Sequence, residues 1–443
     1  MKKKIAAPLL WGWHHCATLL FLGLIVPILW VTTKAGIQKR RVIPRVVFGA
    51  TPIITSKYHS LALQRVAVDS KTVVRGYQLA FSRDDFNIVF GIVEPGWPRW
   101  RRWYTLLLDV YVQLAKLLWQ RDVFFYYFDG FYLRNGGWLW QLELPALKLL
   151  GKRVVVMPYG QDIITVSKSP DLLFKQAFVR DYPEFYGKPQ NERPVYRQVG
   201  HFGRWADSII AGSAVDPYFL GHIDYLMPSS LCIDERLWPL VYGPSRSVGE
   251  AFRVLHAPNH RHIKGTPSLI NAVQRLRDEG LNIELVLLER VPNTEIRRAM
   301  ADCHVVAEQF IMGWHGVFGL EGMVSGKPVL CYLRPEMKRL YTLYSFGSDC
   351  PIVNTPIEKI ADNLRWLYHH PEICEGLGRK GRAYVERYHS LEGMGGFLKG
   401  VISQVWAGQP FDAEEYWRGR RAMAVPAEGA RQPAEQQITA IDD

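Results

Sequence analysis

The sequence predicts an α/β protein of two parallel-sheet domains that face each other across a cleft, with a membrane helix at the N-terminus. The chain has 443 residues, about three times the ~150 residues that serve as a guide for one domain. Short apolar runs alternate with segments of helical periodicity along most of its length, a pattern typical of parallel α/β sheets. Residues 5–31 carry no formal charge, and such a stretch is long enough to cross a bilayer core of ~30 Å.

Composition excludes several classes of protein. Apolar residues make up 48% of the chain and charged residues 22%, which excludes a disordered chain, a collagen-like repeat and a multispan membrane protein. The net charge of +12 is concentrated near the N-terminus, because residues 1–45 hold eight basic residues and no acidic one. This local excess fits a membrane flank and argues against nucleic acid as a partner. The six cysteines form no Cys-x-x-Cys pair, so we expect no metal site, no disulfide framework and a reducing compartment.

Residues 1–40 are expected to form the membrane anchor. Three basic residues precede the apolar stretch (Lys2, Lys3, Lys4), and five follow it (Lys34, Lys39, Arg40, Arg41, Arg45). Because the larger basic flank stays on the cytoplasmic side, we expect the body of the protein in the cytoplasm. A cleaved signal peptide fits less well, since no small-x-small site follows the apolar run. The adjacent His14 and His15 leave a tilted or interfacial helix as an alternative.

Residues 41–245 are expected to form the first domain. It opens with a strand at 45–49, a helix at 59–68 and a second strand at 72–74, which together make a βαβ unit. Further strands are predicted at 88–90, 123–127, 154–157, 209–211 and 225–227. Strands that are apolar throughout are typical of a parallel sheet covered by helices on both faces.

Residues 246–405 are expected to form the second domain, after a linker at 239–250 rich in Gly, Pro and Ser. Strands are predicted at 254–256, 284–288, 305–306 and 329–332, and helices at 267–279, 293–301, 320–325 and within 357–406. Residues 406–443 form a C-terminal extension whose composition turns polar. Residues 426–443 are expected to be disordered.

A glycine-rich loop at 313–329 carries the most informative chemistry (Gly-Trp-His-Gly-Val-Phe-Gly-Leu-Glu-Gly-Met-Val-Ser-Gly-Lys-Pro-Val). It leads into a short helix and is closed by Gly326 and Pro328 before a buried strand. The free N–H groups of the helix start therefore face the carboxyl edge of the sheet, where a diphosphate binds. Glu321, expected in the first turn, is placed to accept hydrogen bonds from a ribose diol. The alternative is that this carboxylate only complements the helix dipole.

This loop resembles the signature of GT-B glycosyltransferases of the group 1 type (family 4), which reads Glu-Gly-Phe-Gly-x(4)-Glu-Ala-Met-Ala-x-Gly-x-Pro-Val. The resemblance implies two Rossmann-like domains and a nucleotide-sugar donor site lined by Gly316, Val317, Phe318 and Gly319. It also implies that Glu321 binds the nucleotide ribose.

One position departs from the signature. The earlier of the family's two glutamates falls at Gly313 in this sequence. The usual contact to the donor sugar is therefore missing, and we expect His315 or Trp314 to substitute for it.

A second match lies at 256–267 (His-Ala-Pro-Asn-His-Arg-His-Ile-Lys-Gly-Thr-Pro), after the first strand of the second domain. It resembles the family segment in which an Arg and a Lys hold the diphosphate, which assigns these roles to Arg261 and Lys264. Thr266 is a favourable N-cap and Pro267 a favourable first helical residue, so both cations lie beside a helix start. Two cations on two phosphates stabilise a leaving nucleoside diphosphate without a metal ion.

In the first domain, residues 158–163 (Pro-Tyr-Gly-Gln-Asp-Ile) follow a buried strand and resemble the family's Gly-Ser-Asp-Ile turn. Asp162 is expected to bind an acceptor hydroxyl or position the sugar. The alternative is an Asx turn or helix cap. Tyr159 stands where many relatives carry a histidine, so histidine general-base chemistry is not expected.

Residues 99–119 begin with Arg-Trp-Arg-Arg-Trp-Tyr and continue as an apolar helix. A basic, tryptophan-rich start suits the membrane interface, where rings and arginines meet the lipid headgroups. The alternative is a core helix of the first domain with a solvated basic end.

The resemblance implies a membrane-anchored glycosyltransferase that moves a sugar from a nucleotide-sugar donor to a glycan or lipid-linked acceptor, as in cell-surface polysaccharide synthesis. We expect retention of anomeric configuration, with no cofactor beyond the nucleotide sugar as co-substrate. The alternative is a catalytically degenerate GT-B scaffold of a polysaccharide assembly complex, which Gly313 favours.

Overall fold

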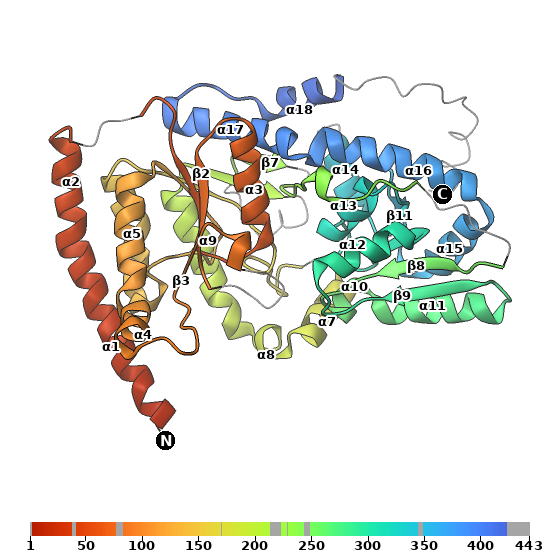
Figure 1. Ribbon diagram of the computed structural model, residues 1–443, viewed down its shortest axis with the longest axis horizontal. Helices are drawn as coiled ribbons and strands as arrows, with labels where there is room; N and C mark the ends of the chain where they lie inside the picture. Colours follow the sequence, from red (N-terminus) through yellow and green to blue (C-terminus); the bar gives the residue numbers. More distant parts are fainter. Residues whose placement is uncertain are drawn as a thin grey trace.

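The computed structural model describes residues 2–37, 41–76, 83–169, 171–212, 223–227, 229–242, 249–343 and 349–422. Two α/β domains lie side by side, and an N-terminal helix flanks the first of them (Figure 1). The predicted fold class is therefore confirmed. The tail predicted to be disordered, 426–443, lies outside the described residues.

The first domain is built on seven strands in the order β3-β2-β1-β4-β5-β6-β7, and all their pairings are parallel. The strands are β1 (Val46–Phe48), β2 (Ser70–Arg75), β3 (Ile88–Phe90), β4 (Val123–Tyr126), β5 (Arg153–Val156), β6 (Ser208–Gly212) and β7 (Tyr225–Met227). All four residues of β4 are buried, as expected for a strand covered on both faces. Every strand predicted in this domain is present.

Helices of the first domain connect these strands. They are α3 (Ile54–Arg65), α4 (Arg99–Leu107), α5 (Asp109–Gln120), α6 (Glu143–Leu149), α7 (Leu172–Asp181), α8 (Pro183–Tyr186) and α9 (Arg193–Trp205), with 3-10 turns at Arg83–Asp85, Arg134–Leu142 (η3) and Pro189–Glu192. Helix α3 starts five residues before the predicted 59–68 and stops earlier. It ends because Ala67 has a φ of 63°, which is incompatible with a continuing right-handed helix.

The second domain has five parallel strands in the order β12-β11-β10-β8-β9. They are β8 (Phe252–His256), β9 (Ile283–Leu287), β10 (Val305–Gln309), β11 (Val329–Cys331) and β12 (Val353–Asn354), with helices α10 (Arg261–Lys264), α11 (Thr266–Asp278), α12 (Asn293–Asp302), α13 (Val317–Val324) and α14 (Pro335–Leu343). The sequence did not predict β12, which has only two residues and therefore no readable periodicity.

The C-terminal helical region is broken into several pieces. They are η7 (Ile357–Lys359), α15 (Ile360–His369), α16 (Pro371–Tyr384), a π-helical turn (Val385–His389), α17 (Leu391–Ala407) and α18 (Ala413–Ala422). Helix α17 returns to the first domain and packs on α3 (Figure 1). A Cβ at Gly395 would lie 2.9 Å from the carbonyl carbon of Ala62. Most of α17 was assigned by the sequence to the second domain, 246–405, but in space it lies on the first.

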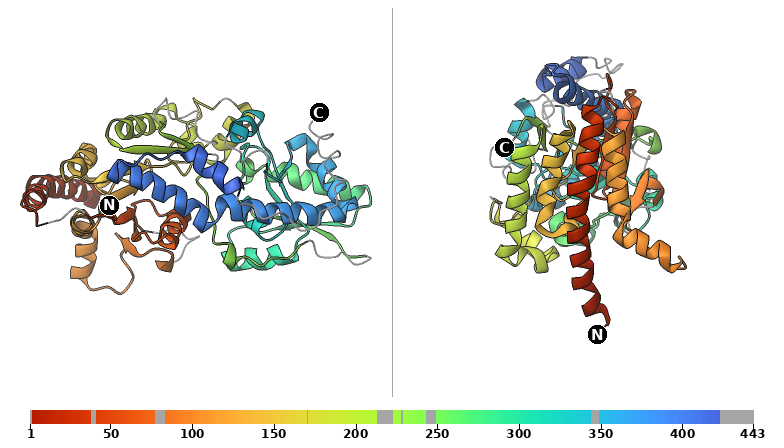
Figure 2. Two further views of the ribbon diagram at one scale, coloured as in Figure 1. Left: turned by 90° about the horizontal axis from the view of Figure 1, so that it is seen from above. Right: turned by 90° about the vertical axis from the view of Figure 1, so that its left-hand side faces the viewer.

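The N-terminal helix consists of α1 (Lys2–Leu20), a π-helical turn (Phe21–Ile25) and α2 (Val26–Lys34). Its segment Pro8–Lys34 is long and apolar enough to cross a membrane. It nevertheless packs along the first domain beside α5 (Figure 2). Phe21 and Val26 belong to the apolar core, and the Tyr111 hydroxyl of α5 donates a hydrogen bond to the His14 carbonyl at 2.9 Å. One side of this helix is thus part of the domain.

Candidate functional site

The glycine-rich loop connects β10 to α13 at the carboxyl edge of the second sheet. Gly316 is extended and α13 begins at Val317, three residues before the predicted start. Val317, Phe318 and Gly319 therefore form the first helical turn, whose N–H groups have no acceptor inside the helix. A Cβ at Gly319 would lie 3.1 Å from His315 Cβ and 3.2 Å from Glu308 Cγ, so a side chain here would push both neighbours aside.

Lys264 meets this loop from α10. Its ammonium donates a hydrogen bond to the Glu308 carboxylate, which is fully buried on β10. A Cβ at Gly316 would lie 3.7 Å from Lys264 Nζ and 3.3 Å from Glu308 Oε1. The structure thus brings the predicted diphosphate lysine to the predicted phosphate-binding helix start.

Glu321 belongs to the same site. It is buried on α13 and accepts a hydrogen bond from Asn293 Nδ2 at 3.4 Å. Burial raises the pKa of Glu321 to about 8, and the carboxylate of Glu308 acts in the same direction while Lys264 opposes it. Since α13 starts at Val317, Glu321 is its fifth residue and no acidic residue occupies the first turn. The expected first-turn position was wrong, and with it the alternative that this carboxylate only complements the helix dipole.

His315 lies beneath the loop. Its side chain is buried, and its Nε2 has no hydrogen-bond partner among the described residues. Burial, together with the neighbouring His389, lowers the pKa of His315 to about 3. The imidazole is therefore neutral at physiological pH and can supply one N–H donor or one acceptor to a ligand.

Arg261 lies at the opposite end of α10 from Lys264. Its Nε and Nη2 donate to the two oxygens of Glu289 at 2.8 and 2.5 Å, and the side chain is half exposed. The helix that follows is capped by Gly265, not by Thr266 as predicted. The Thr266 hydroxyl instead hydrogen-bonds His256 Nε2 at 2.8 Å. The Arg261 guanidinium is thus paired with Glu289. The structure does not bring it to the glycine-rich loop beside Lys264, where the sequence predicted it.

Asp162 organises the turn after β5 in the first domain. Its carboxylate accepts hydrogen bonds from the backbone N–H groups of Tyr159, Gly160 and Phe128 at 2.9–3.0 Å. Burial raises the pKa of Asp162 to about 8, and the nearby Asp129 contributes in the same direction. The two turn N–H groups precede Asp162 in the chain, whereas an Asx turn uses the N–H two residues further on, so Asp162 braces the turn without forming an Asx turn, and its role toward an acceptor stays a prediction.

A polar cluster that the sequence analysis missed lies next to this turn. Asp129 accepts hydrogen bonds from the Thr51 hydroxyl at 2.8 Å and the Tyr159 hydroxyl at 3.0 Å. The three residues follow β1, β4 and β5, whose carboxyl ends meet at one edge of the sheet. The available signal was an acidic residue shortly after the buried strand at 123–126.

Hydrogen bonds and charge interactions link the two domains. Asp181 at the end of α7 accepts hydrogen bonds from the backbone N–H groups of His262 and Ile263 at 3.1 and 2.9 Å, and pairs with His262 Nδ1 at 2.7 Å. Tyr58 on α3 is buried, which raises its pKa, and Glu321 of the second domain raises that pKa further. Helix α10, which carries Lys264, and Glu321 on α13 thus face the first domain.

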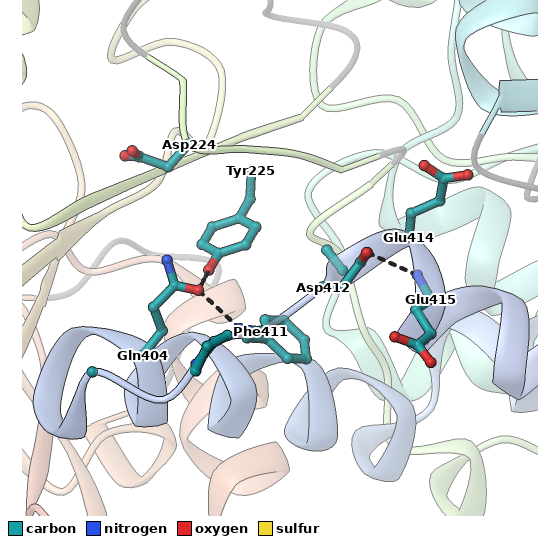
Figure 3. A pocket seen from close by; sticks show the side chains of 10 residues that line it. Asp224, Tyr225, Gln404, Phe411, Asp412, Glu414 and Glu415 are labelled. Carbon is teal, nitrogen blue, oxygen red and sulfur yellow. Dashed lines mark hydrogen bonds between the residues drawn. The ribbon is translucent and has the colours of Figure 1, made fainter.

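A separate depression lies on the C-terminal side of the molecule (Figure 3). It is lined by Asp224, Tyr225, Gln404, Phe411 and the start of α18. Gln404 Oε1 accepts hydrogen bonds from the Tyr225 hydroxyl at 2.5 Å and the Phe411 N–H at 3.2 Å, and Asp412 caps α18. These polar groups hold the α17–α18 connection in place.

The fold is similar to that of solved glycosyltransferases. Sucrose-phosphate synthase from Thermosynechococcus elongatus matches with a TM-score of 0.54 and 13% identity, over 83% of this chain and 100% of that one. HepE from Anabaena, solved in complex with UDP-glucose, matches with a TM-score of 0.50 and 14% identity, over 82% and 100%. This chain has the GT-B fold. A glycosyltransferase from Rickettsia africae, with a TM-score of 0.52 and 10% identity over 83% and 100%, shares it as well.

No protein-family model and no curated protein matches the sequence. The GT-B fold predicted from the two motifs is thus confirmed by structure alone, and the family 4 subtype stays a prediction.

Two further charged residues, Glu308 and Arg334, also contact the glycine-rich loop. The sequence did not predict either of them as a site residue. Each is a charged residue in or just after a buried apolar run, at 305–310 and 329–333.

Proposed function

We propose that this GT-B protein transfers a sugar from a nucleoside diphosphate donor to a hydroxyl of a glycan or lipid-linked acceptor. The observation that carries the proposal is the contact between Lys264, Gly316 and the start of α13, with Glu321 in the same buried site. A cation and unpaired helix N–H groups together bind a diphosphate. The solved complex of HepE with UDP-glucose supports this class of donor.

The chemistry follows from these groups. Glu321 accepts hydrogen bonds from the ribose diol through its carboxyl oxygens, and Lys264 with the α13 N–H groups neutralises charge that develops on the departing diphosphate. The bond between the anomeric carbon and the diphosphate oxygen breaks, and the acceptor oxygen bonds to that carbon. The acceptor oxygen approaches on the face from which the diphosphate departs, so its proton passes to the departing diphosphate oxygen and the configuration is retained. Asp129, with Thr51 and Tyr159, lies on the acceptor side.

Calorimetric titration with uridine, guanosine, adenosine and thymidine diphosphates tests the donor site. We expect one of them to bind at or below millimolar concentration. A Lys264→Met variant that also carries Glu308→Gln removes the cation without leaving a buried charge, and should bind roughly tenfold more weakly or worse. Lys380→Gln, an exposed lysine of α16, is the control. Absence of binding for all four diphosphates contradicts the proposal.

Product analysis separates the enzyme from the scaffold. Incubation with the sugar nucleotide of the base that binds, in the presence of membrane extract as acceptor, should release the diphosphate and yield a glycan of retained configuration by NMR. A scaffold would bind partners but release no diphosphate, and its cellular role would survive the Lys264 and Glu308 substitutions.

We further propose that the N-terminal helix attaches the body to the cytoplasmic face of a membrane by its exposed side. One side of this helix packs on the first domain, so lipid cannot surround it. The opposite side exposes Leu20, Leu24 and Ile28 by 61%, 57% and 58%. Nearby on α4, Trp100 and Trp103 are exposed by 70% and 57%, and the Trp13 indole of α1 donates to the Leu107 carbonyl at 3.1 Å. This arrangement suits the interfacial alternative better than a free span.

A further inference from the structure

An arginine side chain lies against Gly313, the position at which the family signature has a glutamate. Gly313 has a φ of 89°, and a Cβ there would lie 2.5 Å from Arg334 Nε and 2.6 Å from Arg334 Cδ. Arg334 follows β11, and its N–H donates to the Gly313 carbonyl at 3.0 Å. Glycine at 313 therefore makes room for the arginine side chain, and the loop carries a cation where the signature carries a carboxylate.

The Arg334 side chain is buried without a hydrogen-bonded anion. It is 5% exposed, and its Nε has no hydrogen-bond partner among the described residues. Its ion pair with Glu336 is long, 4.0 Å from Nε, and Glu336 is itself largely exposed. A buried charge with so weak a partner is costly for a folded protein. A bound anion beside the loop would complete the pairing of this guanidinium.

The order of groups along the loop locates this anion. Glu321 on α13 marks the ribose end of the proposed donor, and Gly316 with Lys264 marks the diphosphate. Gly313, which the Arg334 side chain contacts, precedes Gly316 by three residues, whereas Glu321 follows Gly316 by five. A nucleotide sugar that runs from Glu321 past Gly316 toward Gly313 would bring its sugar to Arg334. A neutral hexose offers no anion there, whereas a hexuronic acid offers a carboxylate.

We propose that Arg334 binds the carboxylate of an acidic donor sugar, so that the donor is a nucleoside diphosphate hexuronic acid. This inference rests on the proposed glycosyltransferase function. A planar guanidinium matches a carboxylate with two parallel hydrogen bonds. Gly313 is then a specificity determinant of this chain, because any side chain at 313 would displace the arginine.

The test compares three ligands on the full-length protein. Calorimetry first identifies the free nucleoside diphosphate that binds, and then measures the hexuronic acid and the neutral hexose sugar nucleotides of the same base. We expect the wild type to bind the uronate at least tenfold more tightly than the neutral sugar. Arg334→Gln should abolish this preference, yet change the affinity for the free diphosphate by less than twofold. Arg339→Gln, an exposed arginine of α14, should change neither.

The outcomes separate the two proposals. If no diphosphate binds, the proposed function fails and this inference fails with it. If the free diphosphate binds but the wild type prefers the neutral sugar, only the inference is overturned. Equal weakening of free diphosphate and uronate by Arg334→Gln would make Arg334 a phosphate ligand and would also overturn it.

Thermal unfolding provides an independent readout. Because Arg334→Gln removes a buried charge with only a weak partner, the ligand-free variant should unfold at a Tm equal to or above that of the wild type. A lower Tm would show that the arginine has a structural role, which contradicts the inference. Arg334→Lys retains the charge but lacks the planar fork, and should recover only part of the uronate preference.

Discussion

At the scale of single residues, the ion pair between Lys264 and Glu308 dominates the proposed donor site. Glu308 is fully buried and the Lys264 side chain is 15% exposed, so neither charge is well solvated. Loss of one partner of such a pair typically costs about 3–5 kcal/mol. We therefore expect Lys264→Ala to lower the free energy of unfolding by this order, measured by urea denaturation. Adding Glu308→Gln should recover much of the loss, and an equal loss in the double variant would contradict the coupling.

The titration of Glu321 gives a second prediction. The folded state raises its pKa to about 8, whereas in an unfolded chain a glutamate titrates near about 4.3. Between these values the folded protein holds a proton that the unfolded chain has lost, so the free energy of unfolding falls as the pH rises through this window. Glu321→Gln should remove this contribution, which amounts to at most about 1.4 kcal/mol per pH unit.

Urea denaturation of both proteins between pH 5 and pH 9 measures this effect. Burial also raises the pKa values of Asp162 and Glu143. Both groups titrate in both proteins, so their contributions to the free energy of unfolding cancel when the two proteins are compared. Glu321→Gln should gain stability relative to the wild type as the pH rises. A difference that is independent of pH would contradict the raised pKa of Glu321.

The sequence predicted some of these residues and not others for a physical reason. Gly316 and Glu321 belong to one continuous strand–loop–helix segment. Their spacing along the chain was therefore sufficient to predict that they share a site. Glu308 and Arg334 act through contacts between neighbouring strands. Sequence spacing does not encode the distance between strands, so their roles appeared only in the folded chain.

At the scale of secondary-structure elements, α17 is the helix that ties the C-terminal region to the first domain. Its Gly395 approaches the backbone of α3 at Ala62. We expect Gly395→Ala to force the helices apart and to lower the free energy of unfolding by about 1–3 kcal/mol. Gly376→Ala on α16, where a Cβ meets nothing within 4 Å, should be neutral or stabilising by about 0.4–1 kcal/mol. Equal effects of the two substitutions would show that helix packing is not responsible.

Sequence periodicity predicted the strands and most helices of both sheets. It did not predict where α17 packs, because an apolar helical stripe shows that a helix is buried and not which domain buries it. The helical region expected at 357–406 is divided at Pro371, which begins α16, and at Ser390, which caps α17. These interruptions allow the chain to cross from one domain to the other.

At the scale of the whole molecule, the N-terminal helix packs on the first domain, and we propose that its outer side attaches the protein to a membrane. Deletion of residues 1–40 should therefore expose the apolar surface around Tyr111 and lower the Tm, as measured by scanning calorimetry. Charges on the outer side of the helix, Leu20→Glu with Leu24→Glu, should instead release the protein from anionic lipid vesicles in a flotation assay while the Tm stays unchanged. Flotation of this variant with the vesicles would contradict the assigned membrane face.

The side of the membrane on which the N-terminus lies distinguishes an interfacial helix from a span. In inverted membrane vesicles, an N-terminal tag on an interfacial helix should be removed by added protease together with the body. A spanning helix would protect the tag inside the vesicle. Protection of the tag would therefore restore the single span predicted from the sequence.

The carboxylate of Asp181 links the positions of the two domains. It belongs to the first domain, but the N–H groups that it satisfies belong to α10 of the second. Any motion that separates α7 from α10 must break both bonds and leave the two amides to water. The short helix that carries Lys264 therefore loses two backbone hydrogen bonds if it moves away from the first domain.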